Sequence, residues 1–154
     1  MAETVVHALL WFSAIGCGLI AGLYFAFSTF IVQALDRLGA ERGAQAMNAI
    51  NVRILRSLFM PLFLGTTLTS LALVAIGLAG RVPGGPAMAA GGAIYVVGMF
   101  VVTLVFNVPL NNMLAAARDD GGAAWSLYLR RWMPWNHVRT LSSTLACILF
   151  VAAI

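Results

Sequence analysis

The residues best suited to chemistry in this sequence are amides and a guanidinium in two short stretches. Asn107 and Asn111 lie four positions apart, and Asn136 and Arg139 lie three apart, so each pair shares a face if its segment is helical. An asparagine supplies fixed hydrogen-bond donors, and an arginine supplies a permanent cation. Two such faces set against each other could wall a pocket that holds an oxyanion, and preorganised donors of this kind are among the strongest catalytic devices.

Further side chains could border the same pocket. His137 lies between Asn136 and Arg139 and could either move a proton or cap the start of a helix. Trp132 and Trp135 offer flat apolar walls for an aromatic ligand. Earlier segments add three candidate ligand-binding residues, namely Tyr24, Ser28 and Asn51. A structural role stays open for each, because asparagines also hydrogen-bond neighbouring helices and an arginine near a helix end can extend to lipid phosphate.

The segments that carry these residues are typical of a membrane protein. Hydrophobic residues make up 62% of the 154 residues and charged residues 9%, whereas soluble domains are about 25% charged. Crossing the hydrocarbon core takes roughly 20 apolar residues, and four stretches qualify: Val5–Leu35, Ser57–Ala79, Met88–Leu110 and His137–Ile154. The sequence therefore predicts an all-α fold, an integral membrane four-helix bundle in which residues 1–154 form one domain.

Two loops between these spans are predicted to contain amphipathic helices at the membrane interface. In the first loop, apolar residues repeat at helical spacing, namely Met47, Ile50, Ile54 and Leu58. In the third loop, large apolar residues share one helical face, namely Trp125, Tyr128, Leu129 and Trp132. We expect the second of these helices to end at Pro134, because proline disrupts a helix interior.

The loop arginines predict the topology. The first loop carries Arg37, Arg42, Arg53 and Arg56, the third carries Arg118, Arg130 and Arg131, and the second has only Arg81. By the positive-inside rule, the first and third loops are cytoplasmic and both termini lie outside, as in a multi-pass protein of a bacterial inner membrane. These loops account for the net charge of +4, so we expect contact with membrane lipid and no nucleic-acid partner. The polar candidates then gather in the cytoplasmic leaflet.

No metal site is predicted within one chain. His7 and His137 are the only histidines, and the topology puts them near opposite membrane faces. The five acidic residues all lie outside the predicted spans. Cys17 and Cys147 fall inside apolar spans, where a free cysteine behaves as a small hydrophobe. A haem or metal whose ligands are completed between subunits stays open.

Small residues in the first span predict close helix contact. Gly18 and Gly22 are four apart, in a stripe with Ala14 and Ala26, and such spacing lets two membrane helices approach closely. The partner is either another helix of the same bundle or a second copy of the chain, which would make the protein a homo-oligomer.

Four stretches of the sequence resemble the anthrone oxygenase family, a group of small four-helix membrane proteins of which many members have no assigned function. In chain order, these stretches are Ala21–Ser28, Asn48–Asn51, Phe106–Asn112 and Trp132–Thr140. The resemblance covers nearly the whole chain, in the right order and at matching membrane positions. Its most specific parts are the Asn-x-x-x-Asn and Trp-Asn-x-x-Arg spacings.

The resemblance implies an oxygenase that converts an anthrone, or another flat and hydrophobic aromatic compound, into a quinone. O2 would be the co-substrate, and stabilising the enolate would make a metal or flavin unnecessary. The residues then take implied roles: Asn107, Asn111 and Asn136 donate to the enolate oxygen, Arg139 supplies charge, His137 or Tyr24 moves the proton, and Trp132 and Trp135 stack on the rings.

Two other classes of function remain open from the sequence. The first is a non-catalytic membrane protein that binds a lipid or quinone in the same pocket. The second is an electron carrier whose haem or metal is completed by oligomerisation.

Overall fold

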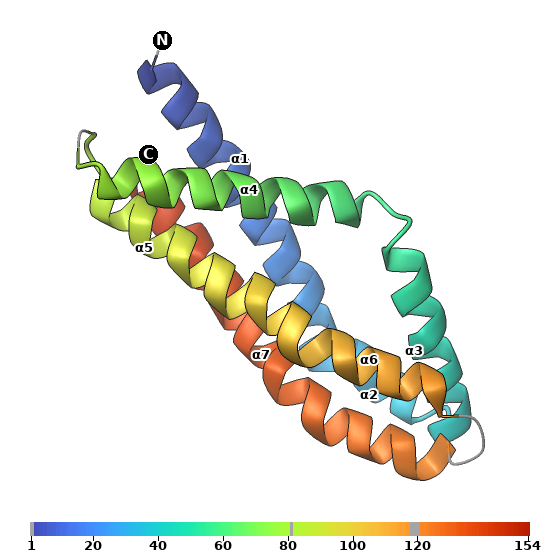
Figure 1. Ribbon diagram of the computed structural model, residues 1–154. Helices are drawn as coiled ribbons and strands as arrows, with labels where there is room; N and C mark the ends of the chain where they lie inside the picture. The colour runs from blue at the N-terminus through green and yellow to red at the C-terminus, as the bar shows by residue number, and fades with distance from the viewer. Residues whose placement is uncertain (1, 81, 118–120) are drawn as a thin grey trace.

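The helices follow one another end to end, so that they form five rods in the part of the chain that the computed structural model describes, residues 2–80, 82–117 and 121–154 (Figure 1). The first rod joins α1 (Ala2–Ala26), the π-helical turn η1 (Phe27–Ile31) and α2 (Val32–Asp36). Next come α3 (Ala40–Ile54) and α4 (Phe59–Leu78). The fourth rod joins α5 (Gly85–Tyr95), η2 (Val96–Val101), η3 (Thr103–Asn107) and α6 (Val108–Ala116), and the last rod is α7 (Gly121–Ala152). These residues contain no strand.

Three rods are long and apolar enough to cross a membrane: Glu3–Asp36, Phe59–Leu78 and Gly85–Ala116. The first three predicted spans fall on them. The fourth predicted span, His137–Ile154, lies in the second half of α7, which packs against α1 and α5. Both termini and the α4–α5 turn lie at one end of the bundle, and the α2–α3 link lies at the other end (Figure 1). The protein is therefore an all-helical protein with membrane-spanning helices.

The prediction that a separate helix ends at Pro134 is wrong, because α7 runs without interruption through this residue. A proline inside a helix removes the hydrogen bond to the carbonyl four residues earlier, here that of Arg130. Side chains on both sides of Pro134 are buried, namely Trp132 and Asn136, so packing holds the helix together. The third-loop helix and the fourth span thus form one rod, which leaves five rods where six helices were expected.

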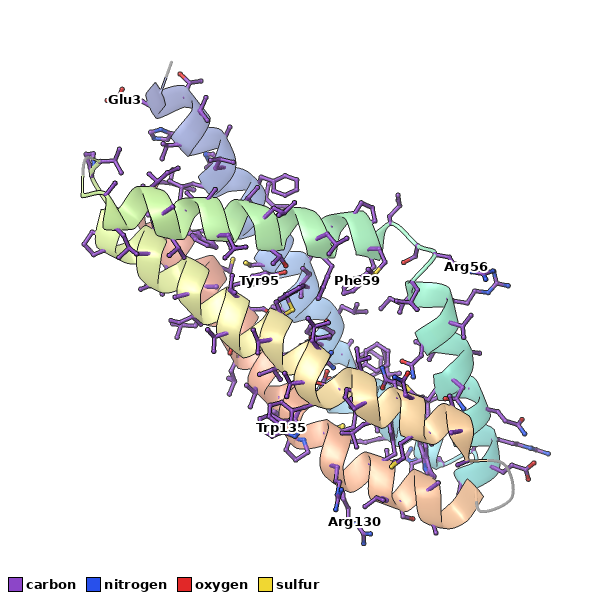
Figure 2. All side chains as sticks on the ribbon, in the orientation of Figure 1. Glu3, Arg56, Phe59, Tyr95, Arg130 and Trp135 are labelled. Atoms are coloured by element: carbon purple, nitrogen blue, oxygen red, sulfur yellow. The ribbon has the colours of Figure 1, made fainter. Side chains whose placement is uncertain are left out.

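A helix, α3, lies in the predicted first loop and packs on α2, α6 and α7. Its position at a membrane interface stays a prediction. At about 1.5 Å per residue, the 20 residues of α4 extend about 30 Å, and the 32 residues of α7 extend about 48 Å. The longer rods therefore project beyond the start of α4, and α3 covers the projecting part (Figure 1). Arg56 and Arg130 point outward in this region (Figure 2). Four loop residues lie outside the described residues: Arg81, Arg118, Asp119 and Asp120.

The buried side chains form two clusters, one on each side of a polar layer. The termini-side cluster includes Leu10, Cys17, Ile20, Tyr24, Phe63, Leu73, Tyr95, Met99 and Phe150. The loop-side cluster consists of Phe27, Val32, Ala44, Met47, Leu114, Trp125, Tyr128 and Trp132. Between the two clusters lie three buried polar residues, Asn107, Asn136 and Arg139.

Glycine allows α4 and α5 to pack backbone against backbone. A Cβ atom on Gly92 would lie 2.5 Å from the carbonyl oxygen of Ser70 and 2.6 Å from Cγ2 of Val74. The predicted small-residue stripe of α1 behaves differently, because Gly22 is exposed with nothing within 4 Å of such an atom. The stripe does not pack as a unit inside this chain, and a homo-oligomer through Gly18 and Gly22 stays a prediction.

A matched pair of substitutions tests the close approach of α4 and α5. Gly92→Ala should lower the free energy of unfolding by about 1–3 kcal/mol, because the added methyl group forces the two backbones apart. Gly22→Ala should leave stability unchanged or raise it by up to about 1 kcal/mol, because alanine favours helix. Thermal unfolding in detergent, followed by circular dichroism, measures both. Equal melting temperatures for the two variants would contradict the packing described.

Candidate active site

Arg139 on α7 lies in the interior of the bundle with 4% of its surface exposed. Its Nη2 atom donates to Oδ1 of Asn136 at 2.7 Å, and Nη1 donates to the Thr103 hydroxyl at 3.5 Å. The guanidinium carbon lies 4.0 Å from the centre of the Tyr24 ring and 5.0 Å from that of Trp132. Helices α1, η3 and α7 therefore all contribute to the surroundings of this side chain.

Each of these contacts is to a neutral group, so no neighbouring negative charge neutralises the positive charge of Arg139 in these contacts. Aromatic faces and amide oxygens stabilise a buried guanidinium in part. A carboxylate would offset the charge fully, but the contacts that the described residues make with Arg139 include none. The Nε atom of Arg139, moreover, is buried and has no hydrogen-bond partner among the residues that the structure describes. Both features suit Arg139 to receive an anionic oxygen.

Asn136 positions Arg139. Its Nδ2 atom donates to the carbonyl oxygen of Tyr24 at 2.9 Å and to the hydroxyl of Ser28 at 2.8 Å. Both N–H groups of this Nδ2 atom donate to residues of the first rod. The amide oxygen of Asn136 therefore faces Arg139. The π-helical turn η1 begins at Phe27, directly beside these two acceptors, and π-helical turns often occur at functional sites.

The other two amides of the predicted pocket lie between the fourth rod and α7. Asn107 is fully buried, and its Nδ2 atom donates to the carbonyl oxygen of Trp132 at 3.4 Å. Asn111 accepts a hydrogen bond of 2.9 Å from the Tyr128 hydroxyl. Burial raises the pKa of Tyr128, so its hydroxyl stays protonated and donates. Both bonds join the fourth rod to α7, and Asn111 also faces open space.

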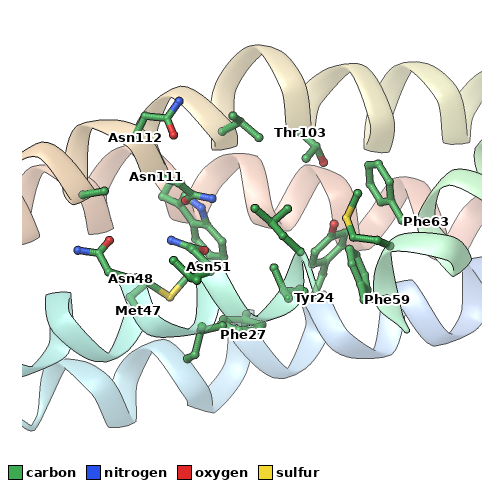
Figure 3. A pocket seen from close by; sticks show the side chains of 18 of the residues that line it. Tyr24, Phe27, Met47, Asn48, Asn51, Phe59, Phe63, Thr103, Asn111 and Asn112 are labelled. Carbon is green, nitrogen blue, oxygen red and sulfur yellow. The ribbon is translucent and has the colours of Figure 1, made fainter. Parts of the chain in front are cut away.

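That space is a cavity of about 350 Å³, a volume within the range of about 300–1,000 Å³ found for small-molecule sites. It lies where α1, η1, α3, α4, η3, α6 and α7 meet. Asn48 and Asn51 on α3 lie across it from Asn111, and Tyr24 and Phe59 lie toward the opposite end (Figure 3). The lining is mostly apolar with a few polar groups, as in pockets for flat hydrophobic ligands.

Four lining residues carry a buried polar atom that has no partner within the described structure. Three atoms are donors, namely Nε of Arg139, Nε1 of Trp132 and Nδ2 of Asn51, and one is an acceptor, Oδ1 of Asn48. A buried group without a partner costs about 1–3 kcal/mol. Five further atoms without a partner among the described residues belong to residues that do not line the cavity, namely Thr66, Ser70, Tyr95, Asn107 and Ser143, so these four atoms alone do not define a ligand.

Several predicted site residues lie away from the cavity. Ser28 contacts Asn136 and does not line it. Trp135 stacks on Phe106, with ring centres 3.6 Å apart, on the outer side of α7 (Figure 2). His137 is exposed. The cavity brings together five of the predicted residues: Tyr24, Asn51, Asn111, Trp132 and Arg139.

Sequence reasoning missed several residues that border the cavity or contact Arg139. Thr103 is four residues before Asn107, so helical spacing from a residue already chosen would have found it. Asn48 begins the Asn48–Asn51 stretch that resembles the family, but it is not among the predicted site residues. Phe59 and Phe63 carry no such signal, because they look like any apolar residues of a span. Both line the cavity from the first turns of α4.

The described residues include no group of three His, Cys, Asp or Glu side chains arranged to hold a metal. His7 and His137 are both exposed. The cysteines Cys17 and Cys147 are free thiols.

Comparison with known proteins identifies the family. The family model described as Anthrone oxygenase matches residues 52–149, more than half of the chain. The chain belongs to the anthrone oxygenase family. The resemblance drawn from the sequence is thereby confirmed. No curated protein and no solved structure matches the chain. The region that matches the family contains Thr103, Asn111, Trp132, Asn136 and Arg139, whereas Tyr24, Asn48 and Asn51 precede it.

Substituting Asn136 tests whether it holds the buried cation. Asn136→Ala removes the acceptor of Arg139 and two bonds to the first rod, so it should lower the free energy of unfolding by about 3 kcal/mol. His137→Ala, its exposed neighbour on the same helix, should change it by less than about 0.5 kcal/mol. Thermal unfolding in detergent compares the two. A similar stability loss in both variants would show that Asn136 has no special structural role.

Proposed function

We propose that the protein is a membrane oxygenase that uses O2 to oxidise a flat, enolisable aromatic compound of the anthrone type to a quinone. Membership of the anthrone oxygenase family supports an oxygenase-like role. The observation that carries the substrate class is Arg139, a buried cation with neutral contacts that lines an apolar cavity. Such a site favours a molecule that is apolar over most of its surface and gains negative charge on one oxygen.

The first step is the formation of an enolate. The central CH2 group of an anthrone lies between two aromatic rings and opposite a ketone, so loss of its proton places negative charge on the ketone oxygen. Nε of Arg139 and Nε1 of Trp132 donate to this oxygen, and charge held by fixed donors in a dry cavity is strongly stabilised. Tyr24, whose ring lies beneath Arg139 in the cavity wall, passes the proton away from the carbon.

The second step is the reaction of the enolate with O2. The enolate carbon transfers an electron to O2, and the two radicals combine to form a C–O bond, which gives a peroxide anion that takes up a proton. The hydroperoxide then loses its remaining C–H proton, the O–O bond breaks, and water leaves as the ketone forms. Anthrone and O2 thus give the quinone and water without another reductant, so this proposal needs no metal or flavin.

The remaining polar residues divide into two groups. Asn51 and Asn111 line the far side of the cavity, where the Nδ2 donor of Asn51 serves a second oxygen of the ligand. Asn107 and Asn136 position Trp132 and Arg139 through the bonds described above and do not line the cavity. The exposed His137 and the outward-facing Trp135 have no part in the reaction.

The proposal includes a membrane arrangement. The second half of α7 is the fourth span, α3 lies at the cytoplasmic interface, and both termini lie outside. The arginines of the α2–α3 link and of α3 support this arrangement through the positive-inside rule. The cavity then faces the cytoplasmic side, as in a multi-pass protein of a bacterial inner membrane.

Anthrone oxidation tests the proposed reaction. Purified protein in detergent should form anthraquinone faster than the uncatalysed reaction, with one atom of ¹⁸O2 in the new ketone. Arg139→Gln should lower the catalysed rate by about 10²–10³-fold, because it removes the charge opposite the enolate oxygen. Arg131→Gln, an exposed arginine on the same helix, is the matched control and should keep the wild-type rate.

Other outcomes would favour the rival functions. Equal rates in the two variants would remove Arg139 from the mechanism. Thermal stabilisation by anthraquinone without any oxidation of anthrone would favour a protein that binds quinones without turnover. A Soret band in the purified protein would overturn the cofactor-free mechanism and favour an electron carrier.

Asn51 tests the far side of the cavity. Asn51→Ala should raise KM for anthrone by about tenfold with little change in kcat, because the amide contacts ligand and transition state alike. Gln45→Ala, an exposed residue on the same helix, should change neither constant. Steady-state kinetics with anthrone measures both variants. A fall in kcat at constant KM would place Asn51 in the chemical step instead.

A further inference from the structure

The cavity has an apolar rim. Most of the lining residues that are also exposed are apolar, namely Val52 at 57%, Leu55 at 63%, Leu104 at 50%, Val108 at 37% and Ala115; the polar Asn112 is exposed as well. A residue that both lines a cavity and is exposed lies where the cavity meets the surroundings. Val52 and Leu55 belong to α3 and the link after it, and Leu104 and Val108 belong to the fourth rod. The opening therefore lies on the side of the bundle, between α3 and the fourth rod.

Packed side chains close both ends of the cavity. On the loop side, Trp125, Tyr128 and Trp132 are stacked with ring centres 5.8 and 5.7 Å apart. Nε1 of Trp125 also donates to Asp36 at 2.8 Å, which ties α7 to the end of α2. On the other side, Phe63 belongs to the termini-side cluster. The packed side chains at both ends leave the exposed rim as the opening of the cavity.

The rim lies at the edge of the hydrocarbon core. The 20 residues of α4 extend about 30 Å, which matches the thickness of that core. Phe59, the first residue of α4, lines the cavity, so the cavity lies at the level where α4 leaves the membrane. Leu104 and Val108 belong to an apolar helix long enough to span a membrane. The same face of this helix continues to Asn112, a polar residue that also lines the cavity.

We propose that this rim is a lateral portal through which an apolar ring compound with a polar oxygen passes directly from the bilayer into the cavity. The identity of the ligand rests on the proposed function, and the route rests on the rim. A compound dissolved in the inner leaflet crosses an apolar opening without exposing its rings to water. On entry, its oxygen loses hydrogen bonds to the polar membrane interface and gains hydrogen bonds from Arg139 and Trp132. The portal selects substrates that partition into membranes and excludes those with a permanent charge on the rings.

The dependence of binding rate on lipid tests this route. The full protein is placed in phosphatidylcholine vesicles, and anthraquinone, which is not turned over, is the probe. Binding is followed by quenching of tryptophan fluorescence in stopped flow, because Trp132 lines the cavity. Two lipid compositions that take up different amounts of anthraquinone are compared at the same free aqueous concentration of the probe. If the probe comes from the bilayer, the composition that holds twice as much anthraquinone per lipid doubles the association rate. A rate that follows the aqueous probe concentration instead would overturn the portal.

A rim substitution gives a second, independent measurement. Leu104→Phe narrows the opening, so association and dissociation should slow by the same factor, about tenfold, while Kd stays constant. Leu145→Phe is the matched control, because Leu145 is exposed on α7 and does not line the cavity. Val108→Phe repeats the test on the neighbouring turn in case one variant fails to fold. Wild-type rates in both rim variants would overturn the portal.

Failure of the portal and failure of the proposed function give different results. Absence of quenching by anthraquinone would overturn the proposed ligand, and with it the function and the portal. Quenching with rates that do not depend on lipid would overturn the portal alone. Anthrone oxidation in detergent, which does not depend on the route of the ligand, would then still report on the function.

Discussion

The burial of one guanidinium constrains the middle of this protein. Removing a charge from water costs several kcal/mol even after the protein relaxes, so Arg139 requires neighbours that replace its hydration. Asn136 supplies an oxygen, and the rings of Tyr24 and Trp132 supply two aromatic faces. These partners come from two rods, and Thr103 adds a third. The rods can solvate the charge in one register only, so a single side chain fixes how they pack at this level.

Two of the π-helical turns, η1 and η3, lie at the same level as Arg139. Ser28, Thr103 and Asn107 all belong to π-helical turns, and each contacts α7 through a hydrogen bond. A π-helical turn widens the helix and shifts the direction of the following side chains. Regular helices would give better backbone hydrogen bonding, so we interpret the irregularity as the local cost of directing three polar side chains toward α7, where Thr103 contacts Arg139 itself.

Helical spacing and composition were enough to predict the apolar helices and the polar layer, and the resemblance of four stretches was enough to predict the family. Spacing and composition were not enough to orient the members of the polar layer. Asn136 and Arg139 are three apart and face inward, whereas His137 is about 100° further round the helix than Asn136 and faces outward. Sequence reasoning predicts a helix end at Pro134 because proline disfavours the interior of a helix. The burial of Trp132 and Asn136 outweighs that local preference, and α7 continues through Pro134. The cavity itself depends on how α3 packs over the longer rods, which is a tertiary contact that no local pattern encodes.

The cavity wall is divided between the membrane helices and α3. The donors proposed to stabilise the enolate belong to α7, inside the region that matches the family, whereas Asn48 and Asn51 lie on α3 just before that region. Helix α3 joins its neighbours through short links at residues 37–39 and 55–58 and is not one of the apolar spans. Substitutions on its inner face can therefore change which ring substituents fit while the membrane helices and the charged centre stay as they are. In the proposed function, the residues that stabilise the enolate and the α3 residues that contact ring substituents therefore belong to different parts of the fold.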